Sequence, residues 1–216
     1  MLVQLMREVK TWFTNQRIQR TLAALEKNGF QTFFASTRSE ALEKVLSLIP
    51  SNANVGIGGS ATLREINLID ALATRGNTIF QHWQQPEENV VAIMRKQLNS
   101  DVFLASSNAV TEDGKLINID KAGNRVAGII FGPKKIILVV GMNKIVENVD
   151  EGIKRAKNVA APMNARRRGD KTPCAVTGVC TDCDAQDRVC NVITIMEKKP
   201  SRSDISVVLV GEELGF

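Results

Sequence analysis

Apolar residues follow two spacings along the chain, one typical of helices and one typical of buried strands. Helical spacing predicts helices over residues 2–25, 39–49, 63–72, 87–98 and 150–160, with stops at Gly29, Pro50 and Pro162. Short apolar runs predict strands over residues 30–35, 55–57, 78–80, 102–105, 192–196 and 205–210. This alternation predicts an α/β fold with a largely parallel sheet that helices cover on both faces.

The pattern changes between residues 109 and 140. Apolar runs at 109–110, 116–119, 126–130 and 136–140 are separated by glycine-containing turns and leave no room for helices. Such runs predict strands joined as hairpins, some of them antiparallel.

Length and composition favour one domain over residues 1–216. The chain has 216 residues, of which 44% are hydrophobic, so it can bury a full core. An N-terminal helix occupies residues 1–29, and its apolar first turns can pack on the core or on another subunit, which makes a homo-oligomer one expectation. A segment rich in arginine and cysteine, residues 164–191, lies between core elements and is interpreted as an insertion.

Charge and hydropathy limit the kinds of binding partner and the cellular location that we expect. The net charge of +5 is modest for this length and aromatic residues are only 5%, which favours small anions or an acidic partner over nucleic acid. No apolar run approaches the roughly 18 residues of a membrane span, and charged residues interrupt the region where a signal peptide has its apolar core. We therefore expect a cytoplasmic protein without a membrane span.

A strand, a glycine turn and a helix follow one another between residues 54 and 72. Gly58 and Gly59 form the turn, and Ser60 or Thr62 can cap the helix, with Glu65 placed as in a capping box. Unpaired N–H groups at such a helix start favour an anion, and glycine allows close approach. The alternative is a turn that needs glycine for its geometry alone.

The same turn matches the dinucleotide fingerprint weakly, through Gly56, Gly58 and Ala61. The acidic residue that should hold a ribose hydroxyl is replaced by the sequence Gln81-His82-Trp83, so no nucleotide cofactor is predicted. His82 is the only histidine, which excludes a multi-histidine metal centre, and the simplest interpretation is a packed or surface residue.

Two further turns carry candidate chemistry. Thr111 and Glu112 lie in one turn, and Asn124 and Arg125 lie in the next. If these turns meet the glycine turn, Glu112 can act as a base or nucleophile and Arg125 can clamp a carboxylate or phosphate. The alternative is a plain hairpin turn with a surface arginine.

Four cysteines follow the spacing C-x5-C-x2-C-x6-C, at Cys174, Cys180, Cys183 and Cys190. Four thiolates can hold zinc or an iron–sulfur cluster, although this spacing matches neither a standard zinc site nor a common ferredoxin. Reduced thiols or a redox pair are the alternatives. The nearby run of residues 166–168, three arginines, favours thiolates, and it lacks the aromatic partners of a nucleic-acid site.

Four stretches together resemble the LUD-domain family, which includes the C-type subunit of bacterial lactate-utilisation systems. They are Val-Gly-Ile-Gly-Gly-Ser-Ala-Thr-Leu-Arg-Glu-Ile from 55, Thr-Glu-Asp-Gly-Lys-Leu from 111, Asp-Lys-Ala-Gly-Asn-Arg from 120 and Val-Leu-Val-Gly-Glu-Glu-Leu-Gly-Phe from 208. The resemblance implies a three-layer α/β sandwich similar to ribose-5-phosphate isomerase, glucosamine-6-phosphate deaminase and the coenzyme A transferases.

The resemblance also implies a function and a set of site residues. It implies a lactate-utilisation-type protein that binds a small carboxylate and contributes to its oxidation with iron–sulfur partner proteins. The implied pocket residues are Gly58, Gly59, Ser60, Glu65, Thr111, Asn124 and Arg125, with Glu112 for proton transfer. Whether the chain catalyses a reaction itself stays open. A stand-alone isomerase or acyl or sugar-phosphate transferase, and a metal-stabilised interaction subunit, are the alternatives.

Overall fold

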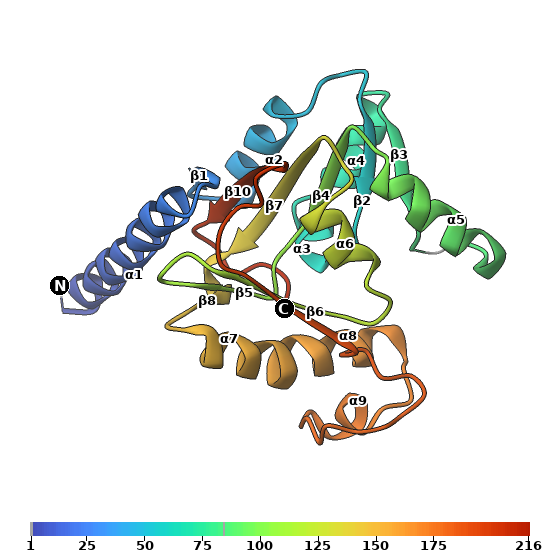
Figure 1. Ribbon diagram of the computed structural model, residues 1–216. Coiled ribbons are helices and arrows are strands. Elements are labelled where there is room, and N and C mark those ends of the chain that lie inside the picture. Colours follow the sequence, from blue (N-terminus) through green and yellow to red (C-terminus); the bar gives the residue numbers. More distant parts are fainter. Residues whose placement is uncertain (1, 84) are drawn as a thin grey trace.

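The computed structural model describes residues 2–83 and 85–216, which form two sheets (Figure 1). The larger sheet is entirely parallel in the order β1-β10-β7-β4-β2-β3. Its strands are β1 (Gln31–Ala35), β2 (Asn54–Ile57), β3 (Thr78–Gln81), β4 (Val102–Ala105), β7 (Lys135–Gly141) and β10 (Asp204–Val210). All six strands therefore end at one edge of the sheet.

The smaller sheet has the order β8-β5-β6-β9. Its strands are β5 (Ala109–Thr111), β6 (Leu116–Asp120), β8 (Ile145–Val146) and β9 (Val192–Met196). The β5–β6 and β6–β9 pairs are antiparallel, as the hairpin-like pattern predicts, and β5–β8 is parallel.

Helices connect and cover the strands. They are α1 (Leu2–Lys27), α2 (Arg38–Ser47), α3 (Ala61–Glu65), α4 (Leu68–Thr74), α5 (Glu87–Leu98), α6 (Asn124–Ile130), α7 (Val149–Arg155), α8 (Ala161–Arg168) and α9 (Pro173–Thr177). A 3-10 turn, Met142–Lys144, follows β7, and a π turn, Ala156–Ala160, joins α7 to α8. The predicted three-layer α/β arrangement with a mostly parallel central sheet is confirmed.

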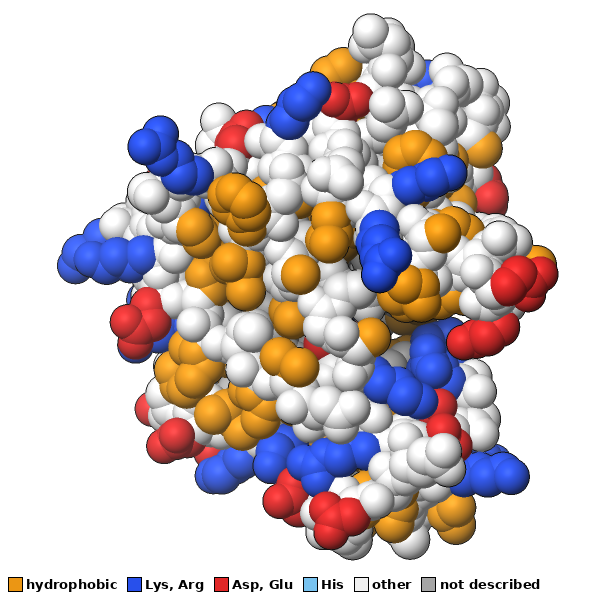
Figure 2. All heavy atoms as spheres, turned by 45° about the vertical axis from the view of Figure 1, so that its right-hand side comes forward, with side chains coloured by type: hydrophobic (Ala, Val, Ile, Leu, Met, Phe, Trp, Pro, Cys, Tyr) orange, Lys and Arg blue, Asp and Glu red, His pale blue; other side chains and the backbone are white. Residues whose placement is uncertain are grey.

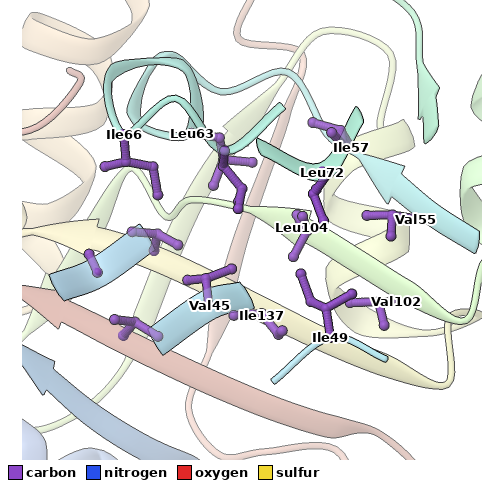
Figure 3. Packing of buried hydrophobic residues seen from close by; sticks show 14 of the residues in the cluster. Val45, Ile49, Val55, Ile57, Leu63, Ile66, Leu72, Val102, Leu104 and Ile137 are labelled. Atoms are coloured by element: carbon purple, nitrogen blue, oxygen red, sulfur yellow. The ribbon is translucent and has the colours of Figure 1, made fainter. Parts of the chain in front are cut away.

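Two apolar clusters fill the two faces of the large sheet. In β7, Ile137 and Val139 point to one cluster, whereas Ile136 and Leu138 point to the other, which is the two-residue period of a strand. Figure 3 shows the first cluster, where side chains of α2, α3 and α4 pack against β2, β4 and β7. The second cluster joins the inner half of α1, helix α6 and the small sheet.

Residues 126–130 form most of helix α6, so the prediction of a strand there is wrong. Val126 and Ile129 are buried three residues apart, whereas Ile130 is 39% exposed. A short apolar run cannot be assigned by periodicity alone. At Gly128 a Cβ atom would lie 2.8 Å from the Phe103 ring, so this glycine lets the helix pack closely on β4.

The predicted helix over residues 63–72 is two short helices. Asn67 adopts the left-handed conformation, φ 54°, between α3 and α4, which breaks the helix while both parts keep one apolar face. Ser60 is the N-cap of α3, because its Oγ accepts from the N–H of Leu63 at 3.3 Å.

The helix predicted over residues 150–160 begins after Asn148 and continues past Pro162. Asn148 is the N-cap, since its side chain accepts from the N–H of Glu151 at 3.0 Å. The π turn and α8 extend the helical run to Arg168. Pro162 falls at the start of α8, where the wider π turn changes the hydrogen-bonding pattern around a residue that has no N–H of its own.

Helix α1 has two different halves. Ile18, Leu22 and Leu25 dock its inner half on the core, whereas the outer half extends away from the sheet (Figure 1). The outer half exposes Leu2, Val3, Leu5, Met6, Val9, Trp12 and Phe13. At 3.6 residues per turn, most of these side chains lie about half a turn away from the docked face. Their stripe is therefore not covered by the core, and a homo-oligomer stays a prediction.

None of the described helices combines the length and the apolar character that a membrane crossing requires.

Candidate functional site

A cavity of about 870 Å³ lies where the strands of the large sheet end. Ser60, Trp83, Ser106 and Lys144 line it, and they follow β2, β3, β4 and β7 respectively. Figure 2 shows a hollow in this face of the molecule, with Lys and Arg side chains (blue) beside it. Loops at the carboxyl ends of parallel strands are the usual place for a ligand in an open α/β sheet.

The charge of the cavity is strongly positive. Among the described residues, six basic and two acidic side chains line it: Arg64, Lys121, Arg125, Lys144, Arg167 and Arg168, with Glu87 and Asp120. Such an excess of one sign in a concave site attracts ligands of the opposite sign. The cavity is therefore suited to an anion.

Lys144 is the most deeply buried cation of the cavity. Only 2% of the residue is exposed. Its Nζ donates to Thr62 Oγ1 at 2.8 Å and to Ser106 Oγ at 3.0 Å. No carboxylate in the described part of the chain lies within 4.0 Å of this amine. The ammonium form therefore lacks a charge partner from the protein.

Burial and, to a smaller extent, the charges of Arg155 and Arg125 together lower the pKa of Lys144 to about 7, against a smaller opposite effect of Glu65. Near neutral pH the amine is thus balanced between its charged and neutral forms. A bound anion would favour the charged form, because an opposite charge raises the pKa of an amine.

Arg125 lies beside Lys144 but is fully engaged by the protein. Its Nη1 donates to Ser106 O (2.9 Å) and Asn118 Oδ1 (2.7 Å), and its Nη2 donates to Asn108 Oδ1 (2.9 Å) and Ile119 O (2.6 Å). Its Nε lies 3.7 Å from Asp120 Oδ2, and its side chain is 11% exposed. These contacts fix β4, β6 and their loops around the cavity.

The glycine turn lies partly in the cavity. Gly59 and Ser60 line it, whereas Gly58 is not among the lining residues that are described, and its N–H donates to Leu104 O at 2.9 Å. A Cβ at Gly58 would lie 3.0 Å from Arg125 Cγ, and one at Gly59 would lie 2.7 Å from Trp83 Nε1. Both glycines therefore make room for neighbouring side chains of the site.

Trp83 lies between two arginines. The Arg64 guanidinium is 4.2 Å from the centroid of the indole ring and the Arg167 guanidinium is 4.1 Å from it. Two planar cations so close to one centroid must lie on opposite faces of the ring. The stack joins α3, the segment after β3 and α8 around the outer part of the cavity.

His82 also lines the cavity. Burial lowers the pKa of this histidine, and its Nδ1 lies 3.1 Å from the Gln97 amide nitrogen. The imidazole is therefore mostly neutral at pH 7.

Only some of the other predicted site residues lie at the cavity. Asn124 lines the cavity with Arg125, Gly59 and Ser60. Thr111 is buried in the hairpin turn, where its Oγ1 accepts from the N–H of Lys115 at 2.8 Å.

Glu65 and Glu112 lie elsewhere. Glu65 is exposed and accepts from the N–H of Gly215 at 2.8 Å. Glu112 pairs with Arg17 Nε at 2.6 Å and with Arg20 Nη2 at 3.3 Å, both on α1. Burial alone would raise the pKa of Glu112, but these two arginines outweigh it and the pKa lies below its usual value. The structure does not bring Glu112 to the cavity.

Lys144, Arg64, Trp83 and Arg167 are cavity residues that sequence reasoning did not select. Lys144 ends the 3-10 turn that follows β7, and a polar residue just past a buried parallel strand is a signal for the sheet edge that carries ligands. Arg167 gives no such signal, because its approach to Trp83 depends on where α8 lies in space.

The four cysteines are half-buried and free. The segment packs on α8 through Ala175 and Val189, and Arg188 donates to the backbone oxygens of Cys183 and Cys190. Within residues 2–83 and 85–216, no three or more His, Cys, Asp or Glu side chains are grouped as metal ligands. Zinc or iron–sulfur binding by the four cysteines stays a prediction that metal analysis and an absorption spectrum can test.

Comparisons with known proteins agree with this architecture. A family model described as LUD domain matches residues 18–210. The crystal structure of a DUF162 family protein from Deinococcus radiodurans is similar, with a TM-score of 0.55 over 91% of this chain and 98% of that chain, at 14% sequence identity. At that identity the likeness shows the fold alone. A search of curated proteins gave no match.

Proposed function

The chain belongs to the LUD-domain family, and from that premise we propose that its cavity binds a small carboxylate such as a hydroxy acid. The family supports a lactate-utilisation-type protein in general. The observation that carries the finer proposal is Lys144, a buried cation at the cavity without a carboxylate partner in the described chain. An isolated buried charge is costly, and an anionic ligand would supply the missing partner.

The proposed binding mode uses groups that already line the cavity. The ammonium of Lys144 pairs with the ligand carboxylate while Thr62 and Ser106 keep the amine in place. The N–H groups of Gly59 and Ser60 have no acceptor among the described residues and are available as further donors. Arg125 contributes its positive charge, but its hydrogens are used by the protein.

The proposal includes partners. Oxidation of a hydroxy acid to a keto acid releases two electrons and two protons, and we propose that iron–sulfur partner proteins accept the electrons. The exposed apolar stripe of α1 supports an association with other proteins, because monomers rarely expose a contiguous apolar patch of this kind.

Calorimetry with lactate and glycolate tests the carboxylate site. We expect wild-type protein to bind at pH 6.5 and Lys144→Met to lose binding, while Lys154→Met binds like wild type. Lys154 is a matched control because it is an exposed lysine of α7 that pairs with Glu151. The affinity of wild type should fall as the pH rises above 7, since the neutral amine cannot pair with a carboxylate. Equal binding by wild type and Lys144→Met, or none by wild type, would overturn the proposal.

The alternative of a stand-alone isomerase or transferase that uses Glu112 as base or nucleophile has less support. Glu112 is held by two arginines of α1 outside the cavity. A carboxylate with a lowered pKa is also a poor base near neutral pH.

A further inference from the structure

The outer part of the cavity holds two cations, Arg64 and Arg167, that form no ion pair with the described residues, although Asp70 and Asp170 act on them at longer range. Arg64 donates to Gln81 Oε1 and Arg167 donates to Asn164 Oδ1, both neutral acceptors. In the described chain no carboxylate lies within 4.0 Å of either guanidinium. By contrast, Lys121 and Arg168, which also line the cavity, both pair with Asp170.

We propose that Arg64 and Arg167 form a second anion subsite, so that the ligand of this cavity is an organic acid with a phosphate group distant from its carboxylate. This inference rests on the proposed function, because it takes the carboxylate to be at Lys144. The phosphate would pair with the two guanidiniums that flank Trp83.

The stack itself favours an anion. Two like charges on opposite faces of one ring repel each other, and burial, Arg168 and Arg64 together lower the pKa of Arg167. Cation–π contacts offset part of this cost. An anion that touches both guanidiniums would offset this repulsion. Relief of the repulsion would then add to the free energy of binding.

The geometry selects among anions. A guanidinium that stacks flat on an indole keeps the N–H groups along its edge free for bidentate contact with oxygens, and phosphate offers three oxygens and more charge than a carboxylate. Both faces of Trp83 are occupied by cations, so a nucleobase cannot stack on this ring. The subsite is therefore suited to the phosphate and not to an aromatic base.

The size of the cavity supports a ligand larger than lactate. Its volume is about 870 Å³. Pockets of about 300–1,000 Å³ hold ligands of drug size, far larger than a three-carbon acid. Lys144 and the three residues of the stack, Arg64, Trp83 and Arg167, all line this one volume.

Glycerate and 3-phosphoglycerate are matched probes, because they differ only in the phosphate. In calorimetry we expect 3-phosphoglycerate to bind wild type at least about tenfold more tightly than glycerate, the effect of one good charge-assisted contact. Arg64→Gln and Arg167→Gln should remove this advantage, so that the two probes bind each variant with similar affinity. Arg166→Gln is the control, since it removes the same charge from a neighbouring exposed residue that is not among the described lining residues.

The outcomes separate the two proposals. If glycerate binds and depends on Lys144, but phosphate adds nothing or its effect survives both arginine changes, the second subsite is wrong and the carboxylate site stands. If 3-phosphoglycerate depends on the arginines but neither probe responds to Lys144→Met, the carboxylate site is wrong and the phosphate subsite stands. An equal loss in Arg166→Gln would show a general charge effect and would overturn the subsite.

Discussion

Arg125 and Arg167 line the same cavity, but they differ in burial and in how many of their hydrogens the protein binds. Arg125 is 11% exposed and gives its Nη hydrogens to four protein oxygens, with Asp120 beside its Nε. Arg167 is exposed, donates to one neutral side chain and stacks on Trp83. An arginine whose donors are all used positions its neighbours, whereas one with free donors can bind a ligand.

Lys144 is an intermediate case. It is as buried as a core residue, but hydroxyl groups occupy only two of its three hydrogens. The lesson is that burial alone does not separate a structural cation from a binding one. The count of satisfied donors and the presence of a counter-charge do.

Replacement of Arg125 should have the largest effect on stability. Arg125→Met removes one donor each from Asn108 Oδ1 and Asn118 Oδ1, leaves the backbone oxygens of Ser106 and Ile119 without this donor, and removes the positive charge beside Asp120. Breaking a buried charged network of this kind costs about 3–5 kcal/mol. Urea unfolding followed by circular dichroism measures the loss, with Arg167→Met as the control. Similar losses in both variants would remove the distinction between the two arginines.

Lys144 should make stability depend on pH. Its folded pKa of about 7 lies below the usual value for lysine, so the unfolded state binds more protons between pH 7 and pH 10. The cost of burying the charge is fully present below pH 7 and declines as the pH rises. The free energy of unfolding of wild type should therefore rise, relative to Lys144→Met, by roughly 3 kcal/mol at most between pH 7 and pH 10.

Urea titrations of both proteins at several pH values give this difference, because the other titrating groups cancel between them. A difference that does not change with pH would mean that Lys144 has an ordinary pKa in the folded state.

Most of the fold follows from local patterns. The parallel strands and the helices between them are confirmed, since long periodic segments carry clear signals. The misplaced elements are short ones. Helix α6 depends on the fit of Gly128 against Phe103, and the break between α3 and α4 depends on the left-handed conformation of Asn67. Neither the fit nor the conformation can be read from the sequence.

The site was less accessible to prediction. Gly59, Ser60, Asn124 and Arg125 all line the cavity. The glycine turn is there because it follows β2, and turns after parallel strands meet at one edge, whereas Asn124 and Arg125 begin α6 after β6 of the small sheet. The turn with Glu112 follows β5, which belongs to the small sheet and leads away toward α1. Which sheet a short strand joins is a tertiary question, and so is the meeting of Arg167 with Trp83.

Loss of the Glu112 charge should have a smaller effect. Glu112→Gln weakens the pairing with Arg17 and Arg20, which are partly exposed, so we expect a destabilisation below about 1 kcal/mol. The lowered pKa of Glu112 means that this contribution is present above the usual pKa of glutamate and is lost as the pH falls through the folded value. Urea unfolding at pH 7 and pH 3 measures it. Affinity for glycerate should not change, and a clear loss of affinity would link Glu112 to the cavity after all.

The smallest change in stability is expected for Arg167→Gln. The variant loses a cation–π contact worth about 0.5–1 kcal/mol, but it also removes the repulsion between Arg167 and Arg64 across Trp83. The two effects oppose each other, so the free energy of unfolding should stay within about 0.5 kcal/mol of wild type. Salt separates them, because added salt screens the repulsion and should stabilise wild type slightly more than the variant. Urea unfolding at low and high sodium chloride, with Arg166→Gln alongside, makes the comparison. A large destabilisation of Arg167→Gln at every salt concentration would show that the stack holds α8 in place and that Arg167 belongs with Arg125 as a structural arginine.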